Sequence, residues 1–171
     1  MTRRHGVAGV GAVLLIVGLS AGCSNGTSIN APFSTKPQAL LPGAPYEVTT
    51  GKVSGLGTVV VDGQGITLYM FATDVRGEPS RCYDICAVQW PPVVLPAGVT
   101  RPVAGPGIDA ALLGSASRVE GTTQVTYNGW PLYVWPPDKG PGEATGQALT
   151  NAGGHWYVLS PSGTPIMTQA P

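Results

Sequence analysis

Two stretches decide the fold of this chain: VDGQGITLYMFATDVR at residues 61–76 and VTYNGWPLYVWPPDKG at residues 125–140. The two stretches align without a gap, and an aromatic residue follows the shared tyrosine by two positions in each, as Phe71 and Trp135. The identical pairs are Val61 and Val125, Gly65 and Gly129, Leu68 and Leu132, Tyr69 and Tyr133, and Asp74 and Asp138. An internal repeat of this kind predicts two copies of one structural unit.

Each copy carries the signals of a β-hairpin. In the first copy, residues 58–61 are β-prone, residues 62–65 contain the turn and residues 66–71 return. In the second, residues 123–127 lead to Asn128 and Gly129, and residues 132–135 return. Asn-Gly is a strong hairpin signal because both residues tolerate a positive φ. Residues 47–50 and 156–159 are predicted to be further strands.

The returning strand of the first copy is apolar on both faces. Leu68 and Met70 point one way, and Tyr69 and Phe71 point the other way. A strand of this kind is usually covered on both sides. A single hairpin is only marginally stable, so the two copies should share a core.

We therefore predict a mainly β fold, a small antiparallel sheet or sandwich built from two related hairpin-containing repeats with pseudo-twofold symmetry. One or two short helical turns are expected beside it. One follows Ser80, which is placed to cap it, and the other covers residues 108–113 and is closed by Gly114.

The N-terminus has the form of a secretory signal. Arg3 and Arg4 precede an apolar run at residues 7–19, which is shorter than the ~20 residues of a transmembrane helix. Small residues then lead to Cys23, and this arrangement resembles the lipobox of bacterial lipoproteins. The resemblance implies cleavage before Cys23, a diacylglycerol on its sulfur, and a chain held by its acyl groups on the extracytoplasmic side of the cell membrane.

These features predict a simple domain plan. Residues 1–22 are the removed signal peptide, and residues 23–45 are a lipidated flexible tether rich in proline and small polar residues. Residues 46–160 form the two-repeat β domain, with repeat one at about 56–95 and repeat two at about 121–160. Residues 161–171 are expected to be a frayed tail. With nine basic and nine acidic residues the chain has no basic excess for nucleic acid.

The Tyr-x4-Asp spacing at Tyr69 and Asp74, repeated at Tyr133 and Asp138 behind a lipobox cysteine, resembles a family of bacterial secreted lipoprotein repeats marked by that motif. The resemblance extends over about residues 46–161 and implies a secreted two-repeat lipoprotein. It implies no biochemical activity, because the family is itself of unknown function. Further matching stretches are Gly65-x-Thr-Leu-Tyr-x-Phe71, Cys82-x3-Cys86-Ala-x2-Trp90-Pro-Pro92, Thr122-Thr-Gln-Val-Thr-Tyr-Asn-Gly-x-Pro-Leu-Tyr133 and Gly153-Gly-x-Trp-Tyr157.

Cys82 and Cys86 are the cysteines that remain beside a lipidated Cys23. Outside the cytoplasm such a pair most simply forms a disulfide. The alternative is a redox-active dithiol, but the thioredoxin-type spacing is two residues rather than three. Arg81 is the only adjacent cation that would lower a thiol pKa.

Metal or haem handling is a further alternative. His155 is the only histidine left after cleavage, and with Met70 or Met167 it would offer ligands to copper or haem. A zinc site needs three or four ligands, so carboxylates would have to join it. The simpler interpretation is a polar residue beside Trp156, and we predict no cofactor.

The repeated aspartates, Asp74 and Asp138, follow buried-type tyrosines just past a strand. A carboxylate there can accept backbone N–H groups and fix a turn. The functional alternative is a Ca²⁺ site that pairs them with Glu78 and Glu143, but neither loop has EF-hand spacing. We therefore interpret the motif as a structural corner.

The predicted function is a non-catalytic binding or structural module of the cell envelope, anchored by lipid at Cys23, with a protein or small-molecule partner that the sequence does not name. A hydrolase is disfavoured because Gly114-Ser-Ala-Ser lacks the nucleophile elbow. The alternative function is an extracytoplasmic redox or metal/haem-handling protein that uses Cys82, Cys86 or His155.

Overall fold

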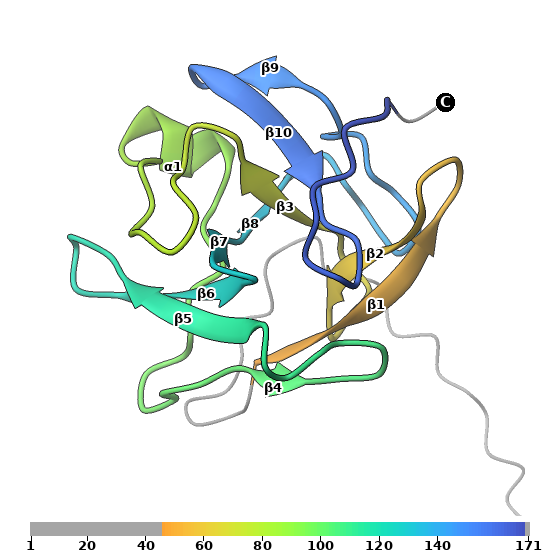
Figure 1. The fold of residues 1–171 in the computed structure, drawn as a ribbon. Coiled ribbons are helices and arrows are strands. Elements are labelled where there is room, and N and C mark those ends of the chain that lie inside the picture. The colour runs from red at the N-terminus through yellow and green to blue at the C-terminus, as the bar shows by residue number, and fades with distance from the viewer. Residues whose placement is uncertain (1–45, 170–171) are drawn as a thin grey trace, which may run out of the picture. The chain divides into compact units, whose positions relative to one another are not determined.

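A computed structural model describes residues 46–169 (Figure 1). The signal peptide, Cys23 and the tether lie outside the described residues. Residues 46–95, which contain the first copy, supply β1 (Glu47–Val53), β2 (Gly57–Asp62), β3 (Leu68–Phe71) and α1 (Ile85–Gln89). The rest of the described chain supplies β4 (Val103–Ala104), β5 (Leu113–Ser117), β6 (Thr123–Tyr127), β7 (Trp130–Pro131), β8 (Tyr133–Val134), β9 (Thr150–Asn151) and β10 (Gly154–Val158).

Three small, mostly antiparallel sheets hold these strands. Their orders are β2-β1-β4, β8-β3-β10-β9 and β5-β6-β7. The mainly β fold predicted from the repeats is confirmed, with α1 as the single helix among residues 46–169. Two of the three sheets end in the strands β4 and β5, which are both edge strands.

The two copies interleave in the central sheet. β3 of the first copy lies between β8 and β10 of the second copy. Tyr69 is the cross-strand neighbour of Tyr133, and Phe71 is the neighbour of Trp156. The shared core expected from the repeats is thus built strand by strand from both copies.

The hairpins are shorter than the sequence predicts. Asn128 and Gly129 have φ values of 48° and 78°, as an Asn-Gly turn requires, and β6 pairs with β7 across them. The chain then leaves β6, and β8 pairs with β3 instead. In the first copy only the isolated bridge from Val61 to Thr67 remains. The returning strands leave because pairing with the other copy buries both of their apolar faces.

β3 divides the interior into two clusters, as its pattern predicts. Leu68 and Met70 belong to one cluster, whereas Tyr69 and Phe71 belong to the other. All four side chains are buried, so the strand is covered on both faces. Large side chains from both copies therefore meet on either side of one four-residue strand.

Four stacked aromatic rings form the centre of the second cluster. Trp90 and Trp156 stack with centroids 3.9 Å apart, and Trp135 and Phe71 lie on the outside, each 4.2 Å from its neighbour. Each outer ring stacks on the tryptophan of the other copy, so the stack carries the pseudo-twofold symmetry. Stacked and edge-on aromatic pairs are worth about 0.5–1.5 kcal/mol each beyond the area they bury.

Two local predictions were wrong. No helix forms at residues 108–113: residues 110–112 form a turn and Leu113 begins β5. The Asp109 side chain accepts the N–H of Ala111, and the carbonyl of Leu112 accepts the N–H of Asn128 at 2.7 Å. This bond draws the chain into β5. Ser80 does not cap α1, since its hydroxyl lies 2.6 Å from that of Tyr133 and Asp84 occupies the cap position without a side-chain bond.

The tail after Pro161 also differs from the frayed segment expected. Ile166 donates its N–H to Val158 at 2.9 Å, and the Gln147 side chain donates to the carbonyls of Ile166 and Thr168. Residues 160–168 are therefore held against the domain.

Candidate functional site

The motif tyrosines and aspartates pair across the two copies. Tyr69 donates its hydroxyl to Asp138 with 2.6 Å between the oxygens, and Tyr133 donates to Asp74 at 2.7 Å. All four residues are buried. Each motif is therefore completed by the other copy.

The second carboxylate oxygen of each aspartate holds its own loop. Asp74 accepts the backbone N–H of Arg81 at 2.7 Å, and Asp138 accepts that of Thr145 at 2.8 Å. Both acceptors lie seven residues before the donor, so the two aspartate loops have matching geometry although Pro136 and Pro137 occur in only one of them.

Burial governs the electrostatics of this network. Burial raises the pKa of Tyr69 and of Tyr133, and the neighbouring aspartate raises each pKa further. Burial also raises the pKa of Asp74, while the hydrogen bonds from Tyr133 and from the Arg81 N–H oppose that shift. The tyrosines are therefore neutral donors at ordinary pH.

The oxygens of both aspartates are occupied by protein donors, and the tyrosine rings pack edge-on against Trp90 and Trp156. Glu78 is exposed. Glu143 accepts the N–H of Lys139. The arrangement fixes the joint between the copies.

Cys82 and Cys86 lie at disulfide distance, with Cα atoms 5.2 Å apart. Cys82 is fully buried in the aromatic cluster, and Cys86 is half-buried in the first turn of α1. The link ties the short helix to the core directly beneath it.

His155 is exposed at the start of β10 and lies 3.0 Å from the hydroxyl of Thr150 through its Nδ1 atom. Within residues 46–169, no three His, Cys, Asp or Glu side chains gather closely enough to hold a metal ion. Met70 is buried in the other cluster, whereas Met167 is exposed.

A surface feature that the sequence analysis did not identify lies on α1 and the tip of the β5–β6 hairpin. Ile85, Val88 and Val119 are 70%, 73% and 83% exposed, and we call these three residues the α1 patch. A hollow of about 570 Å³ is lined by Val119 and by residues that neighbour Ile85 and Val88 in the chain. The lining residues are Tyr83, Asp84, Ala87, Arg118, Val119 and Glu120.

Arg118 holds the two sides of this hollow together. Its guanidinium donates to the carbonyl of Cys82 at 2.9 Å and to Gln124 at 2.7 Å, and it pairs with Glu120. It also lies 4.8 Å from the ring centroid of Tyr83. These contacts of Arg118 therefore hold the hairpin tip and the segment before α1 in fixed positions.

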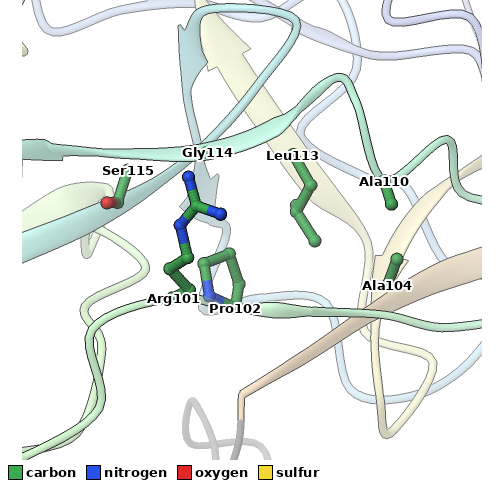
Figure 2. Close-up of a pocket in the computed structure, with 7 residues that line it drawn as sticks. All are labelled: Arg101, Pro102, Ala104, Ala110, Leu113, Gly114 and Ser115. Carbon is green, nitrogen blue, oxygen red and sulfur yellow. The ribbon is translucent and has the colours of Figure 1, made fainter.

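A second hollow, of about 390 Å³, lies between the edge strands β4 and β5 (Figure 2). We call it the edge hollow. Figure 2 shows the side chain of Arg101 extending across it toward Gly114 of β5, with the hydroxyl of Ser115 nearby. The other lining residues are Pro102, Ala104, Ala110 and Leu113.

Comparison with protein families gives one match, to a family described as a secreted repeat of unknown function. Its model matches twice, over residues 52–94 and 114–160. The chain belongs to this family. Searches of curated proteins and of solved structures gave no match.

Membership of the secreted-repeat family places the chain outside the cytoplasm. The two matched segments coincide with the two copies that the sequence predicted, and they include α1 and the tip of the β5–β6 hairpin. Arg101, Ala104 and Ala110 of the edge hollow lie between the matched segments. None of the helices in the described part of this secreted-repeat protein has the length and apolarity to span a bilayer.

The motif tyrosines and aspartates were identified from the sequence, but the α1 patch and the edge hollow were not. Ile85 and Val88 are three residues apart, which places them on one face of a helical turn. Without the rest of the fold this spacing is equally typical of a helix that buries that face. No sequence motif pointed to Arg101 as a binding residue. Its site lies between β4 and β5, which are separate in the sequence and become neighbours only in the folded protein.

Proposed function

We propose that this chain is a lipid-anchored, non-catalytic binding module of the cell envelope, and that the α1 patch is its binding surface. The lipobox-like sequence before Cys23 supports the anchor, and membership of a secreted family supports the location. The observation that carries the binding role is the exposure of three large aliphatic side chains on neighbouring elements.

The exposure of α1 is unusual for a helix of a small domain. None of its residues is buried, so α1 contributes no side chain to the interior except through its cysteine. Large apolar side chains that are exposed on neighbouring elements and surrounded by polar residues mark interaction sites in soluble proteins. The disulfide and Arg118 hold this surface in one conformation before binding, which reduces the entropy lost on association.

A protein partner fits this surface better than the membrane. Segments that insert into a bilayer combine apolar side chains with several free Lys or Arg residues. Arg118, the cation that lines the hollow beside the α1 patch, is already paired with Glu120. An aliphatic patch with a balanced ion pair at its rim is typical of a protein interface.

Cross-linking in the native envelope tests the binding surface. A photo-reactive amino acid replaces Val88 in the full-length protein, and the matched control carries it at Met167, which is exposed to a similar degree. We expect a discrete cross-linked protein from position 88 only, and we expect its loss when V119D is added. Lipid adducts at position 88, equal products at both positions, or products insensitive to V119D would contradict the proposal.

Detergent partitioning tests the anchor separately. We expect the wild-type protein to enter the detergent phase of cell extracts and Cys23→Ser to remain in the aqueous phase or as uncleaved precursor. Mass spectrometry of the N-terminal peptide should show the acyl chains on Cys23. An unmodified Cys23 peptide in the mature protein would refute lipid anchoring without affecting the binding surface.

A further inference from the structure

The edge hollow lies between β4 and β5, and no other strand among residues 46–169 pairs with their outer edges. β5 ends the sheet β5-β6-β7, and β4 ends the sheet β2-β1-β4. Unpaired edge strands present rows of N–H and C=O groups to any extended chain that approaches them. The space between these two edges is the hollow of about 390 Å³ in Figure 2.

The register shows which backbone groups of β5 are open. Arg118 donates its N–H to Thr122, and Asn128 donates to Leu112, so the even-numbered residues of β5 bond to β6. Successive residues of a strand turn their backbone groups to opposite sides. The N–H and C=O groups of Leu113, Ser115 and Ser117 therefore point away from β6, toward the open edge.

On β4 the same reasoning selects Ala104. Val103 and Gly105 donate their N–H groups to Tyr46 and Val48, at 2.8 and 2.7 Å. Ala104, between them, turns its backbone groups away from β1. It lines the edge hollow opposite β5.

β5 lacks the residues that usually protect an edge strand from pairing with another chain. Its sequence, LGSAS, has no charged residue and no proline. Natural edge strands are commonly protected by lysine, proline or a bulge. A five-residue edge without these features is open to strand addition.

Arg101 gives the edge hollow a preference for a negatively charged group in a bound segment. Residues 46–169 contain one ion pair, between Arg118 and Glu120, so no carboxylate of the described chain lies within 4.0 Å of the Arg101 guanidinium. The guanidinium crosses the hollow toward β5 (Figure 2). An arginine so placed can take a carboxylate through two parallel hydrogen bonds.

We propose that the edge hollow binds an extended segment of another protein as an added strand on β5, with a carboxylate of that segment held by Arg101. Main-chain bonds to Leu113, Ser115 and Ser117 supply affinity, and Arg101 supplies selectivity for an acidic peptide. Residues 24–45 of this chain contain no Asp or Glu, so they do not match Arg101. A second copy of the uncharged β5 would leave Arg101 without a carboxylate. This site is distinct from the α1 patch.

The test uses a display library of random octapeptides, selected on the full-length protein. Ser115→Pro removes one open N–H without removing a bond to β6, because the N–H of Ser115 does not face β6, and proline is tolerated on edge strands at such positions. We expect selected peptides to prefer the wild type over Ser115→Pro by at least tenfold and to carry Asp, Glu or a terminal carboxylate. Peptides that bind both proteins equally, or no enrichment, would overturn the proposal.

A second variant covers the case in which Ser115→Pro does not fold. Arg101 is exposed, and Arg101→Gln leaves β5 unchanged. We expect the enriched peptide to bind this variant about tenfold more weakly, as for other lost charged hydrogen bonds, and its Asn analogue to bind both proteins alike. Hydrogen exchange should slow at residues 113–117 only when peptide is added. Slowing that depends on protein concentration alone would assign the edge to a second copy, and unequal binding of the Asn analogue would refute the role of Arg101.

Discussion

At the scale of single residues, the hydroxyl of Tyr133 contacts two other buried polar side chains of the core. It donates to Asp74 and lies beside Ser80. We expect Tyr133→Phe to lower the free energy of unfolding by about 1–3 kcal/mol, because it leaves a buried carboxylate short of one donor. Tyr133→Ala should cost about 3–5 kcal/mol through lost packing. Urea unfolding measures both, and Tyr157→Phe, at a half-buried position, is the control with no expected change.

A double-mutant cycle separates the bond from the packing. Tyr133→Phe and Asp74→Asn remove the two ends of one contact, so their effects should be non-additive. The pair Tyr133→Phe with Asp138→Asn, which belong to different contacts, should be closer to additive. Strict additivity in the first pair would contradict the crossed hydrogen bond.

Buried carboxyls also give the protein a pH dependence. Burial raises the pKa of Asp62, and its Oδ2 atom has no hydrogen-bond partner among the described residues. In the unfolded chain an aspartate loses its proton near pH ~3.9. Above that pH the folded state binds more protons than the unfolded state. This contribution to stability is therefore complete below the unfolded pKa and is lost as the pH rises through the folded pKa.

We expect Asp62→Asn to flatten this decline. The difference in unfolding free energy between wild type and variant, measured in urea at intervals from pH 3.5 to 7, should shift against the wild type as the pH rises. A difference that stays constant, or that moves in favour of the wild type, would show that Asp62 is not perturbed by burial.

At the scale of elements, α1 depends on its covalent tie. No residue of the helix is buried, and a helix of five residues has little stability of its own. The Cys82–Cys86 loop is short, so replacing both cysteines with serine should cost about 2 kcal/mol by loop entropy. Thermal unfolding of the double variant measures the loss, and hydrogen exchange should increase first at residues 83–89. An unchanged melting temperature and unchanged exchange would contradict this role.

The sequence predicted the turns better than the pairings between strands. Asn128 and Gly129 both tolerate the positive φ that this turn requires, so the turn could be predicted from these two residues alone. The strands that pair with β3 must bury Tyr69 and Phe71 on one face and Leu68 and Met70 on the other. Those strands lie far along the chain, so the pairing could not be predicted from the residues of β3 alone. Residues 108–113 have a helical composition, but a single bond from Asn128 to Leu112 draws them toward a sheet.

The candidate surfaces were less predictable still. The aspartates were interpreted from their recurrence, which is a sequence property. The α1 patch and the edge hollow exist because no other part of the described chain packs against them. A sequence shows which side chains are apolar, but it does not show which of them stay uncovered in the fold. Val119, for example, is β-branched and apolar, which is typical of a core strand, yet it lies 83% exposed at the tip of a hairpin.

At the scale of the whole molecule, neither copy should fold alone. β3 has both of its hydrogen-bonded neighbours in the second copy. We expect separate fragments of residues 46–112 and 113–169 to be unfolded by near-ultraviolet circular dichroism and an equimolar mixture to regain the wild-type aromatic signal. The stacked tryptophans from both copies make this signal sensitive to association. A native-like signal from either fragment alone would show that the copies are independent.

The crossed tyrosine–aspartate bonds have a consequence for inheritance. Each aspartate accepts a hydroxyl from the other copy as well as an N–H of its own loop, so selection acts on the two copies together. Loss of the carboxylate at position 138 removes the acceptor of the Tyr69 hydroxyl, which is encoded far away in the gene. A lineage that duplicates one copy alone gains a half with nothing to complete it. Copy number among related genes should therefore change in steps of two.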